Sequence, residues 1–195
     1  MSYLRARSIT LRLFAAAAAA VAAATGGIAS AAYAASSSPA ARAAPNISAC
    51  TANTIRARVA VSHGHEASGI TYYPLDFTNT GRSTCSLSGY PVVSAISRAG
   101  VRLGSPAGRP LLTIAPRVVL APGATAHTTL AYHDRLVSAG GRCGSVDTAV
   151  ELRVYLDGQK RATYAAFRIR ACSHAGPVYL TITGPFRAGA GTNQG

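Results

Sequence analysis

Short runs of alternating apolar and polar residues, separated by Gly, Pro and Asn, fill residues 46–187 of this sequence. In the clearest run, Thr148–Leu156, the even positions from Val150 are apolar and the odd positions carry Glu151, Arg153 and Tyr155. A period of two is typical of a strand with one buried face, and no window beyond the first 34 residues keeps a helical period. Short strands with turn signals between them predict an all-β fold, an immunoglobulin-like antiparallel β-sandwich.

The same alternation predicts the other strands. They are Ile55–Val61, Ile70–Thr78, Tyr90–Ile96, Val101–Leu103, Leu111–Ile114, Arg117–Leu120, Thr125–Tyr132, Ala162–Ala171 and Val178–Ile182. Asp157-Gly158 predicts a two-residue hairpin turn in which both residues take a positive φ. Because Pro74 cannot donate a ladder hydrogen bond, we expect its strand to be an edge strand or to contain a bulge.

The first 34 residues have the organisation of a secretory signal peptide. A basic segment with Arg5, Arg7 and Arg12 precedes the apolar stretch Leu13–Ala24, and Ala32-Tyr33-Ala34 supplies a small-x-small cleavage pattern. The alternative, an uncleaved membrane anchor, needs about 20 apolar residues, which is more than this stretch provides. We therefore expect cleavage after Ala34 and a secreted mature chain without a transmembrane segment.

Composition divides the rest of the chain into a linker, one domain and a tail. Residues 35–45 are rich in Ala, Ser and Pro and predict a flexible linker, whereas residues 188–195 predict a disordered tail. Residues 46–187 suffice for one β-sandwich domain. The first Cys is Cys50, well past the leader, so we expect no lipobox Cys and release from the cell.

Positive charge is in excess. The chain carries 19 Lys and Arg against 6 Asp and Glu, and loss of the leader with its three Arg lowers the formal net charge from +13 to +10. A basic exported protein is attracted to anionic polymers, so the expected partner is an anionic cell-envelope polymer or another exported protein. The Arg residues are spread along the strands without interleaved aromatic clusters, which does not indicate nucleic-acid binding. A solvated strand face is their simplest role.

Four Cys residues in an exported chain indicate two disulfides. Spacing alone permits three connectivities, but hairpin register favours one of them. If Leu156 faces Gln159 across the predicted turn, then Cys143 faces Cys172 at the open end of the same hairpin. We therefore predict a Cys143–Cys172 disulfide.

The other hairpin gives the second disulfide. Cys50 precedes the strand Ile55–Val61 and Cys85 follows Ile70–Thr78, with the midpoint in the loop of residues 63–69. We therefore predict a Cys50–Cys85 disulfide. Metal sites usually place two Cys a few residues apart, which this sequence does not do, and export disfavours a reduced catalytic Cys.

The outer face of the hairpin between residues 148 and 171 is a candidate ligand-binding surface. Its candidate residues are Arg153, Tyr155, Tyr164 and Arg168. The predicted register also places Asp147 opposite Arg168 and Glu151 opposite Tyr164, and the first of these is a favourable cross-strand pair. The alternative is an ordinary solvated sheet face.

His63-Gly64-His65-Glu66 is the densest group of metal-ligand residue types. An alternative function is therefore a metal-handling extracellular protein that uses His63 and His65, with a third ligand from His127, His133 or His174. A hydrophilic loop explains the same residues more simply. We expect no bound cofactor.

Signatures of enzymes are not found in the sequence. It contains no G-x-S-x-G elbow and no phosphate-binding glycine motif, and its six acidic residues suggest no acid–base pair. We therefore expect a non-enzymatic binding or interaction module at the cell envelope or in the medium.

Three short motifs carry a family resemblance. They are Phe77-Thr78-Asn79-Thr80-Gly81, the segment Cys85–Pro91 of the form C-x-L-x-G-Y-P, and Leu120-Ala121-Pro122-Gly123. Together with the four Cys they resemble an uncharacterised family of secreted domains that is abundant in actinobacteria. The resemblance covers roughly residues 50–183 and implies an exported β-sandwich with paired Cys, without an established activity or catalytic residues. Asn79 and Gly81 suit a tight turn, and Tyr90 suits a packed strand entry, so the motifs favour a scaffold role.

Overall fold

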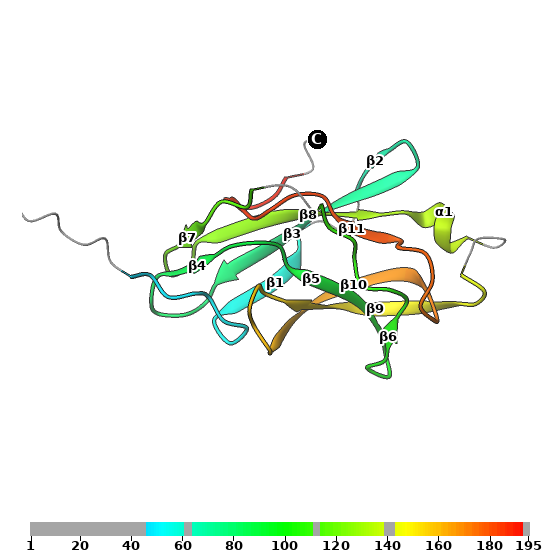
Figure 1. Ribbon diagram of the computed structural model, residues 1–195, viewed down its shortest axis with the longest axis horizontal. Helices are drawn as coiled ribbons and strands as arrows, with labels where there is room; N and C mark the ends of the chain where they lie inside the picture. The colour runs from blue at the N-terminus through cyan, green and yellow to red at the C-terminus, as the bar shows by residue number, and fades with distance from the viewer. Residues whose placement is uncertain (1–45, 61–63, 111–113, 139–142, 193–195) are drawn as a thin grey trace, which may run out of the picture. The chain divides into compact units, whose positions relative to one another are not determined.

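The computed structural model describes residues 46–60, 64–110, 114–138 and 143–192. The predicted signal peptide and linker lie outside these ranges. Within them, two larger antiparallel sheets form a β-sandwich with one short helix (Figure 1). The immunoglobulin-like sandwich with two disulfides is therefore confirmed. None of the helices described in these ranges is both long and apolar enough to cross a membrane.

The larger sheet has six strands among the described residues. Its central order is β1-β3-β8-β11, with β2 beside β3 and β12 beside β8, and every pairing is antiparallel. The strands are β1 (Ile55–Val59), β2 (His65–Ala67), β3 (Ile70–Asn79), β8 (Thr125–Tyr132), β11 (Leu180–Ile182) and β12 (Arg187–Ala188). We call this layer the six-stranded sheet.

The opposite layer is a four-stranded sheet with the order β10-β9-β5-β6, and a separate two-stranded sheet pairs β4 with β7. The elements are β4 (Cys85–Leu87), β5 (Val92–Ser97), β6 (Arg102–Leu103), β7 (Val118–Leu120), β9 (Val146–Tyr155), β10 (Ala162–Cys172) and helix α1 (Asp134–Val137). The alternation did not indicate β2, β4, β12 or α1, which are too short to show a period. The predicted strand Leu111–Ile114 lies mostly outside the described residues, and Ile114 forms no strand.

The core lies between the two larger sheets. Leu75 and Phe77 of β3 are fully buried, as the alternation predicts, and face Leu152 and other apolar side chains of the four-stranded sheet. Phe186, which precedes β12, inserts beside Phe77 with the two ring centroids 5.0 Å apart in an edge-to-face arrangement. This insertion anchors the C-terminal part of the domain to the six-stranded sheet.

Pro74 lies in a central strand, so the edge-strand alternative is wrong. β3 pairs with β8 along one side and with β1 and then β2 along the other. Pro74 lies opposite the interruption between β1 and β2, where the Ala60 N–H donates to its carbonyl oxygen (2.9 Å). A proline is tolerated there because its missing N–H faces an irregular stretch of the neighbouring strand. The ladder between β3 and β8 runs through the pair Pro74–Thr129 without a register shift, so no bulge is found in this ladder either.

The turn between β9 and β10 differs from the predicted one. Gly158 has a positive φ of 70°, whereas Asp157 does not, and the Gln159 N–H donates to the carbonyl oxygen of Leu156 (3.0 Å). β10 begins only at Ala162, so the connection is longer than two residues. The prediction of two positive-φ turn residues with Leu156 opposite Gln159 as the first strand pair is therefore wrong.

The longer connection shifts the strand register. Tyr164 faces Arg153 instead of Glu151, which faces Ala166. A bulge between Ala166 and Ile169 adds a further shift. As a result Asp147 faces Ala171, and the predicted pairing of Asp147 with Arg168 is also wrong.

Both predicted disulfides are present. Cys50 is joined to Cys85 and Cys143 to Cys172, with Cα–Cα distances of 4.9 and 5.0 Å. Cys172 pairs with Val146 in the sheet, so strand register does not itself bring Cys143 to Cys172. Instead, residues 143–145 fold back at the open end of the hairpin, where the Ser145 N–H donates to the carbonyl oxygen of Cys143 (2.8 Å).

The motif residues meet at one corner of the sandwich around Asn79, which is fully buried. Its Nδ2 donates to the carbonyl oxygens of Ser83 (2.9 Å) and Leu120 (3.0 Å), and its Oδ1 accepts from the Gly81 N–H (2.9 Å). Gly123 has a φ of 80° in the turn that follows β7. This network holds the β3 turn against β7, which is a scaffold role.

Candidate functional site

The outer face of the six-stranded sheet carries a row of four polar side chains, one from each of four strands. Asp76 of β3 is paired with Arg58 of β1 and with His127 of β8, and His127 is paired with Arg187 of β12. The Cβ atoms of directly opposed residues lie about 4.5–5.5 Å apart. The row therefore places a carboxylate, an imidazole and two guanidinium groups next to one another.

Asp76 is the buried member of this row, with only 2% of its surface exposed. Its Oδ2 lies 3.6 Å from Nη2 of Arg58, and its Oδ1 accepts a hydrogen bond from the Gly191 N–H (2.8 Å). A buried carboxylate needs such partners because removal from water penalises its charge. The negative charge of Asp76 is thus offset by the ion pair with Arg58, while its Oδ2 has no hydrogen-bond partner among the described residues.

Residues 188–192, which composition placed in a disordered tail, cross the outer face of this sheet, and we call them the C-terminal strap. Ala188 belongs to β12, and the Gly189 N–H donates to the carbonyl oxygen of Thr125 (2.8 Å). A Cβ atom on Gly191 would lie closer to Pro74 than real Cβ atoms come. Only glycine therefore allows the strap to reach Asp76.

His127 is oriented by the same strap. Its Nδ1 lies 2.9 Å from the carbonyl oxygen of Gly189. Because a carbonyl oxygen only accepts hydrogen bonds, this contact places a proton on Nδ1. In the neutral ring Nε2 is then an acceptor for a second partner.

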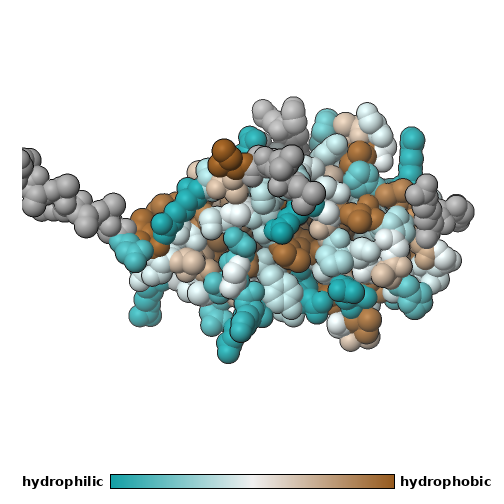
Figure 2. Space-filling model, in the orientation of Figure 1, coloured by the Kyte–Doolittle hydropathy of each residue, from teal (hydrophilic) through white to brown (hydrophobic). Residues whose placement is uncertain are grey.

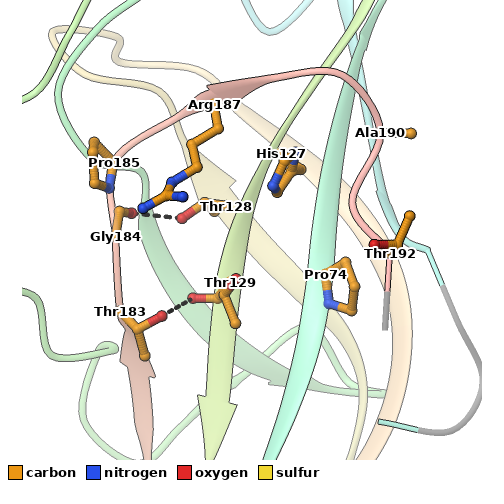
Figure 3. Close-up of a pocket in the computed structure, with 10 residues that line it drawn as sticks. All are labelled: Pro74, His127, Thr128, Thr129, Thr183, Gly184, Pro185, Arg187, Ala190 and Thr192. Carbon is orange, nitrogen blue, oxygen red and sulfur yellow. Dashed lines mark hydrogen bonds between the residues drawn. The ribbon is translucent and has the colours of Figure 1, made fainter. Parts of the chain in front are cut away.

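A cleft of about 290 Å³ lies on this face between the strap and the chain that connects β11 to β12 (Figure 3). Its polar lining includes His127, Thr129, Thr183 and Arg187, and Ala190 and Thr192 of the strap form one side. Figure 3 shows the Arg187 side chain extending from β12 towards Gly184. The cleft therefore has a positively charged end beside hydroxyl-bearing walls.

Two hydrogen bonds fix the wall opposite the strap. The Thr128 hydroxyl donates to the carbonyl oxygen of Gly184 (2.6 Å), and the Thr183 hydroxyl donates to the carbonyl oxygen of Thr129 (3.4 Å). The Thr128 residue is buried, whereas Thr183 is exposed. The wall is thus held by the protein itself, while the Thr183 hydroxyl remains accessible to a ligand.

The charge of Arg187 is not neutralised by the described part of the chain. The ion pairs found there are Arg58–Asp76 and Arg170–Asp134. An exposed guanidinium beside hydroxyl groups can hold an oxyanion by charge-assisted hydrogen bonds while the hydroxyls contact neutral oxygen atoms. The chemistry of this cleft therefore suits an anionic ligand that also carries hydroxyl groups.

The predicted histidine site is not assembled in the described residues. His63 lies outside them, and His65 is an exposed residue of strand β2 rather than of a loop. His65 faces Tyr72, whereas His127 faces Asp76, which is four residues farther along β3, or about 13 Å at the usual rise per residue. Nowhere in the described ranges do three His, Cys, Asp or Glu side chains gather in a way that could hold a metal ion.

Three of the four candidate residues on the four-stranded sheet lie together. Arg153 faces Tyr164 across the hairpin, and its guanidinium carbon lies 5.8 Å from the ring centroid of Tyr155, within cation–π range. Tyr164 is 51% exposed. Arg168 lies within the bulge, beside Val150, and is not part of this cluster.

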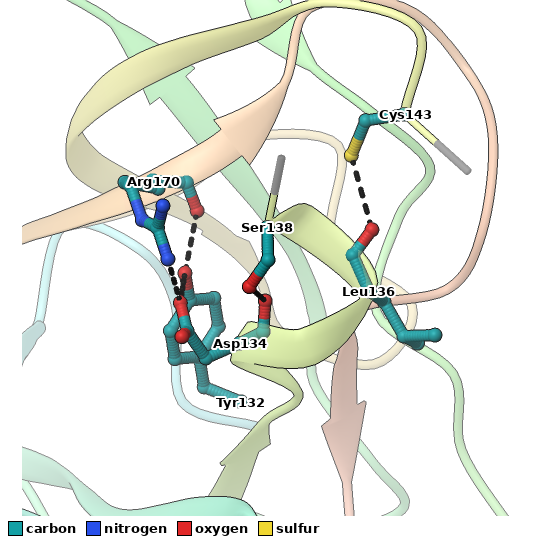
Figure 4. Close-up of polar contacts among 6 residues, drawn as sticks. All are labelled: Tyr132, Asp134, Leu136, Ser138, Cys143 and Arg170. Carbon is teal, nitrogen blue, oxygen red and sulfur yellow. Dashed lines mark hydrogen bonds and ion pairs between the residues drawn. The ribbon is translucent and has the colours of Figure 1, made fainter. Parts of the chain in front are cut away.

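A second polar cluster joins the two sheets near α1 (Figure 4). Asp134 at the start of α1 forms a 2.7 Å ion pair with Arg170 of β10, and it accepts a hydrogen bond from the Tyr132 hydroxyl (3.2 Å). Burial and the nearby Asp134 carboxylate raise the pKa of Tyr132, so this phenol stays protonated. The Sγ atom of Cys143 lies 3.4 Å from the carbonyl oxygen of Leu136, but a disulfide sulfur holds no proton, so this is only a contact. The cluster joins the layers rather than forming a site.

The sequence reasoning missed the cleft. Alternation in Thr125–Tyr132 places Thr125, His127 and Thr129 on one face, so a polar face of β8 could be predicted. The approach of Arg187 could not, because β12 is only two residues long and follows an irregular segment. For His127 the sequence suggests only a role as a third metal ligand.

Comparison with known proteins gives one finding. Residues 50–184 match the family described as Domain of unknown function (DUF4232). No curated protein and no solved structure matches the chain.

Proposed function

The chain belongs to the DUF4232 family, and we propose from its own surface that it is an exported, non-enzymatic binding module whose ligand is an anionic polymer of the cell envelope. The excess of unpaired positive charge carries this proposal. Without the predicted leader the chain keeps a formal net charge of +10, and the ion pairs among the described residues engage only Arg58 and Arg170. The remaining cations favour association with a polyanion.

The distribution of the charge supports a polymer rather than a compact acidic partner. Arg56 lies on β1, Arg102 on β6 and Arg187 on β12, so cations outside these ion pairs occur on both sheets. Figure 2 likewise shows hydrophilic side chains spread among apolar ones on the visible face. A flexible polyanion can follow such a surface, and its attraction is screened by salt.

The covalent framework supports export. Two disulfides stabilise a domain in an oxidising compartment, and they are rare in the cytosol. The organisation of residues 1–34 as a signal peptide agrees with that location. Asp76, the carboxylate nearest the cleft, is covered by the strap, with its Oδ1 bound to the Gly191 N–H and its Oδ2 3.6 Å from Arg58.

Co-sedimentation tests this proposal. The purified protein is mixed with insoluble cell-envelope material from a high-GC Gram-positive bacterium at low and at high ionic strength. We expect the protein to pellet at low ionic strength and to be released by salt. The reason is that salt at 0.1 M largely screens the attraction between exposed charges more than about 10 Å apart. Protein that stays in the supernatant at low ionic strength contradicts the proposal.

A further inference from the structure

We propose that the cleft between the C-terminal strap and the β11–β12 connection binds a phosphodiester group of a polyol phosphate polymer. Arg187 binds the phosphate oxygens, and the hydroxyls of Thr129 and Thr183 contact the polyol. This inference rests on the proposed function, because it names the polymer chemistry and the site on the domain.

Arg187 supplies the anion-binding group. It is exposed on β12, it lies directly opposite His127, and the nearest carboxylate in the row, Asp76, is paired with Arg58 instead. A guanidinium presents several N–H donors in one plane, which matches two oxygens of a phosphate. The positive end of the cleft is therefore free to accept an oxyanion.

The hydroxyl groups explain why a polyol phosphate fits better than an acidic peptide. The Thr183 hydroxyl can give up its long, exposed 3.4 Å bond to the Thr129 carbonyl oxygen and turn to a ligand. A threonine hydroxyl can both donate and accept a hydrogen bond, and so can a polyol hydroxyl. Hydrogen bonds between the protein and the polyol can therefore form in either direction. His127 adds an acceptor at Nε2, because its Nδ1 is engaged by Gly189.

The size of the cleft limits the ligand to a small unit. Its volume of about 290 Å³ is close to the smallest volumes of typical ligand pockets, which are about 300 Å³. One phosphate with an adjoining polyol carbon chain is a ligand of that scale. A polymer would then place successive units over other exposed cations of the same sheet face, such as Arg56 of β1.

Calorimetric titration with small probes tests the site. The purified protein is titrated with glycerol phosphate, glycerol and inorganic phosphate, and the same titrations are made with Arg187→Gln and with the matched control Arg161→Gln. Arg161 is exposed in the connection between β9 and β10 on the other sheet. We expect glycerol phosphate to bind more tightly than either other probe, with a roughly tenfold loss in Arg187→Gln and less than about a twofold change in Arg161→Gln.

A second variant separates the polyol from the phosphate. Thr183→Val keeps the charge and removes one hydroxyl, so it should reduce the preference for glycerol phosphate over inorganic phosphate. Vesicles containing phosphatidylglycerol test whether a lipid is the source of the same headgroup chemistry. We expect the protein to bind these vesicles more weakly than it binds soluble polyglycerol phosphate. Unfolding temperatures of all variants, expected to be close to the parent value, show that they fold.

Several results overturn the inference. Equal binding of glycerol phosphate by the parent and Arg187→Gln, no binding, equal affinity for inorganic phosphate, or preferred retention on vesicles each contradicts it. If the protein pellets with envelope material but does not bind glycerol phosphate, the proposed function stands and this site is wrong. If it binds glycerol phosphate but does not pellet, the site stands and the proposed polymer function is wrong.

Discussion

Asn79 shows at the residue scale how one side chain holds several segments together. It is fully buried, and its amide satisfies the carbonyl oxygens of Ser83 and Leu120 as well as the Gly81 N–H. A buried polar group without a partner costs about 1–3 kcal/mol, so removal of this amide leaves several groups unpaired at once. Asn79 of the F-T-N-x-G motif thus holds one corner of the domain together.

Replacement of this amide should destabilise the domain. We expect Asn79→Ala to lower the free energy of unfolding by about 2–4 kcal/mol, because the carbonyl oxygens of Ser83 and Leu120 lose their donor. Urea unfolding measures the change. The exposed neighbour Arg82 provides the control, since Arg82→Ala should change stability by less than about 0.5 kcal/mol. Equal stability of the two variants would refute the role of the network.

Tyr179 gives a residue-scale prediction for alkaline pH. The side chain is fully buried, its hydroxyl donates to the carbonyl oxygen of Leu103 (2.9 Å), and burial raises the pKa of Tyr179 to about 12. The folded chain therefore keeps a proton that the unfolded chain loses near pH 10. Burial also raises the pKa values of Tyr73 and Tyr132, which act in the same direction.

The sign of the effect follows from these raised pKa values. The stabilisation is complete below pH 10 and is lost as the pH rises through about 12, and it amounts to at most about 3 kcal/mol for Tyr179. Urea unfolding at a series of pH values measures it. Tyr179→Phe should be less stable at neutral pH, because Leu103 loses a partner, but should show a shallower alkaline decline. An unchanged slope in Tyr179→Phe would be evidence against this assignment.

The C-terminal strap is the element that the sequence describes least well. Its composition of small residues is typical of a tail, yet Gly189 and Gly191 donate hydrogen bonds to Thr125 and to the buried Asp76. Small residues are required here because the strap passes close over Pro74, where a Cβ atom on Gly191 has no room. The composition of a segment indicates how flexible it is in isolation. It does not indicate whether another part of the chain, here the outer face of the six-stranded sheet, offers a surface on which the segment can pack.

A single methyl group should detach this strap. Gly191→Ala places a Cβ atom against Pro74 and the Asp76 carboxylate, so we expect a loss of about 1.5–3 kcal/mol from the hydrogen bond to the charged group. Urea unfolding and the rate of limited proteolysis near the C-terminus report it.

The neighbouring variant Ala190→Ser, at an exposed position, serves as the control and should leave both quantities unchanged. If Gly191→Ala behaves like Ala190→Ser, the strap does not hold Asp76.

The β9–β10 hairpin shows how far alternation determines an element. It places β9 and β10 within two residues of their bounds, because burial of one face needs a period of two. Register depends on the turn and the bulge, and the three residues after Asp157-Gly158 carry no pattern that reveals them. On the candidate ligand-binding surface of this hairpin, Tyr164 therefore lies opposite Arg153 and not opposite Glu151 as predicted.

For the whole molecule, the fold and the disulfides could be predicted, whereas the binding cleft could not. The disulfide prediction withstood the wrong register because a disulfide needs only that Cys143 and Cys172 flank the open end of a hairpin. The cleft brings Thr129 together with Thr183 and Arg187, both of which lie more than 50 positions after Thr129 in the sequence. No local sequence pattern predicts that such distant residues come together. Long-range packing thus decides the site.

The disulfides should stabilise the whole domain. Their sequence separations of 35 and 29 residues correspond to about 3–4 kcal/mol each in the chain-entropy model. We expect replacement of Cys143 and Cys172 by Ser to lower the free energy of unfolding by about this amount, measured by urea unfolding under non-reducing conditions. Addition of a reductant to the parent should cost more, because it breaks both bonds. A reductant without effect on stability would contradict this prediction.

The most direct test of the central claim is to map the polymer contact by NMR. Amide resonances of the isotope-labelled protein are followed while soluble polyglycerol phosphate is added at low ionic strength. We predict that the shifts are largest at Thr129, Thr183, Gly184 and Arg187 and that these become smaller in Arg187→Gln. Shifts centred instead on Arg153, Tyr155 and Tyr164 of the other sheet, or no shifts at all, would contradict the claim.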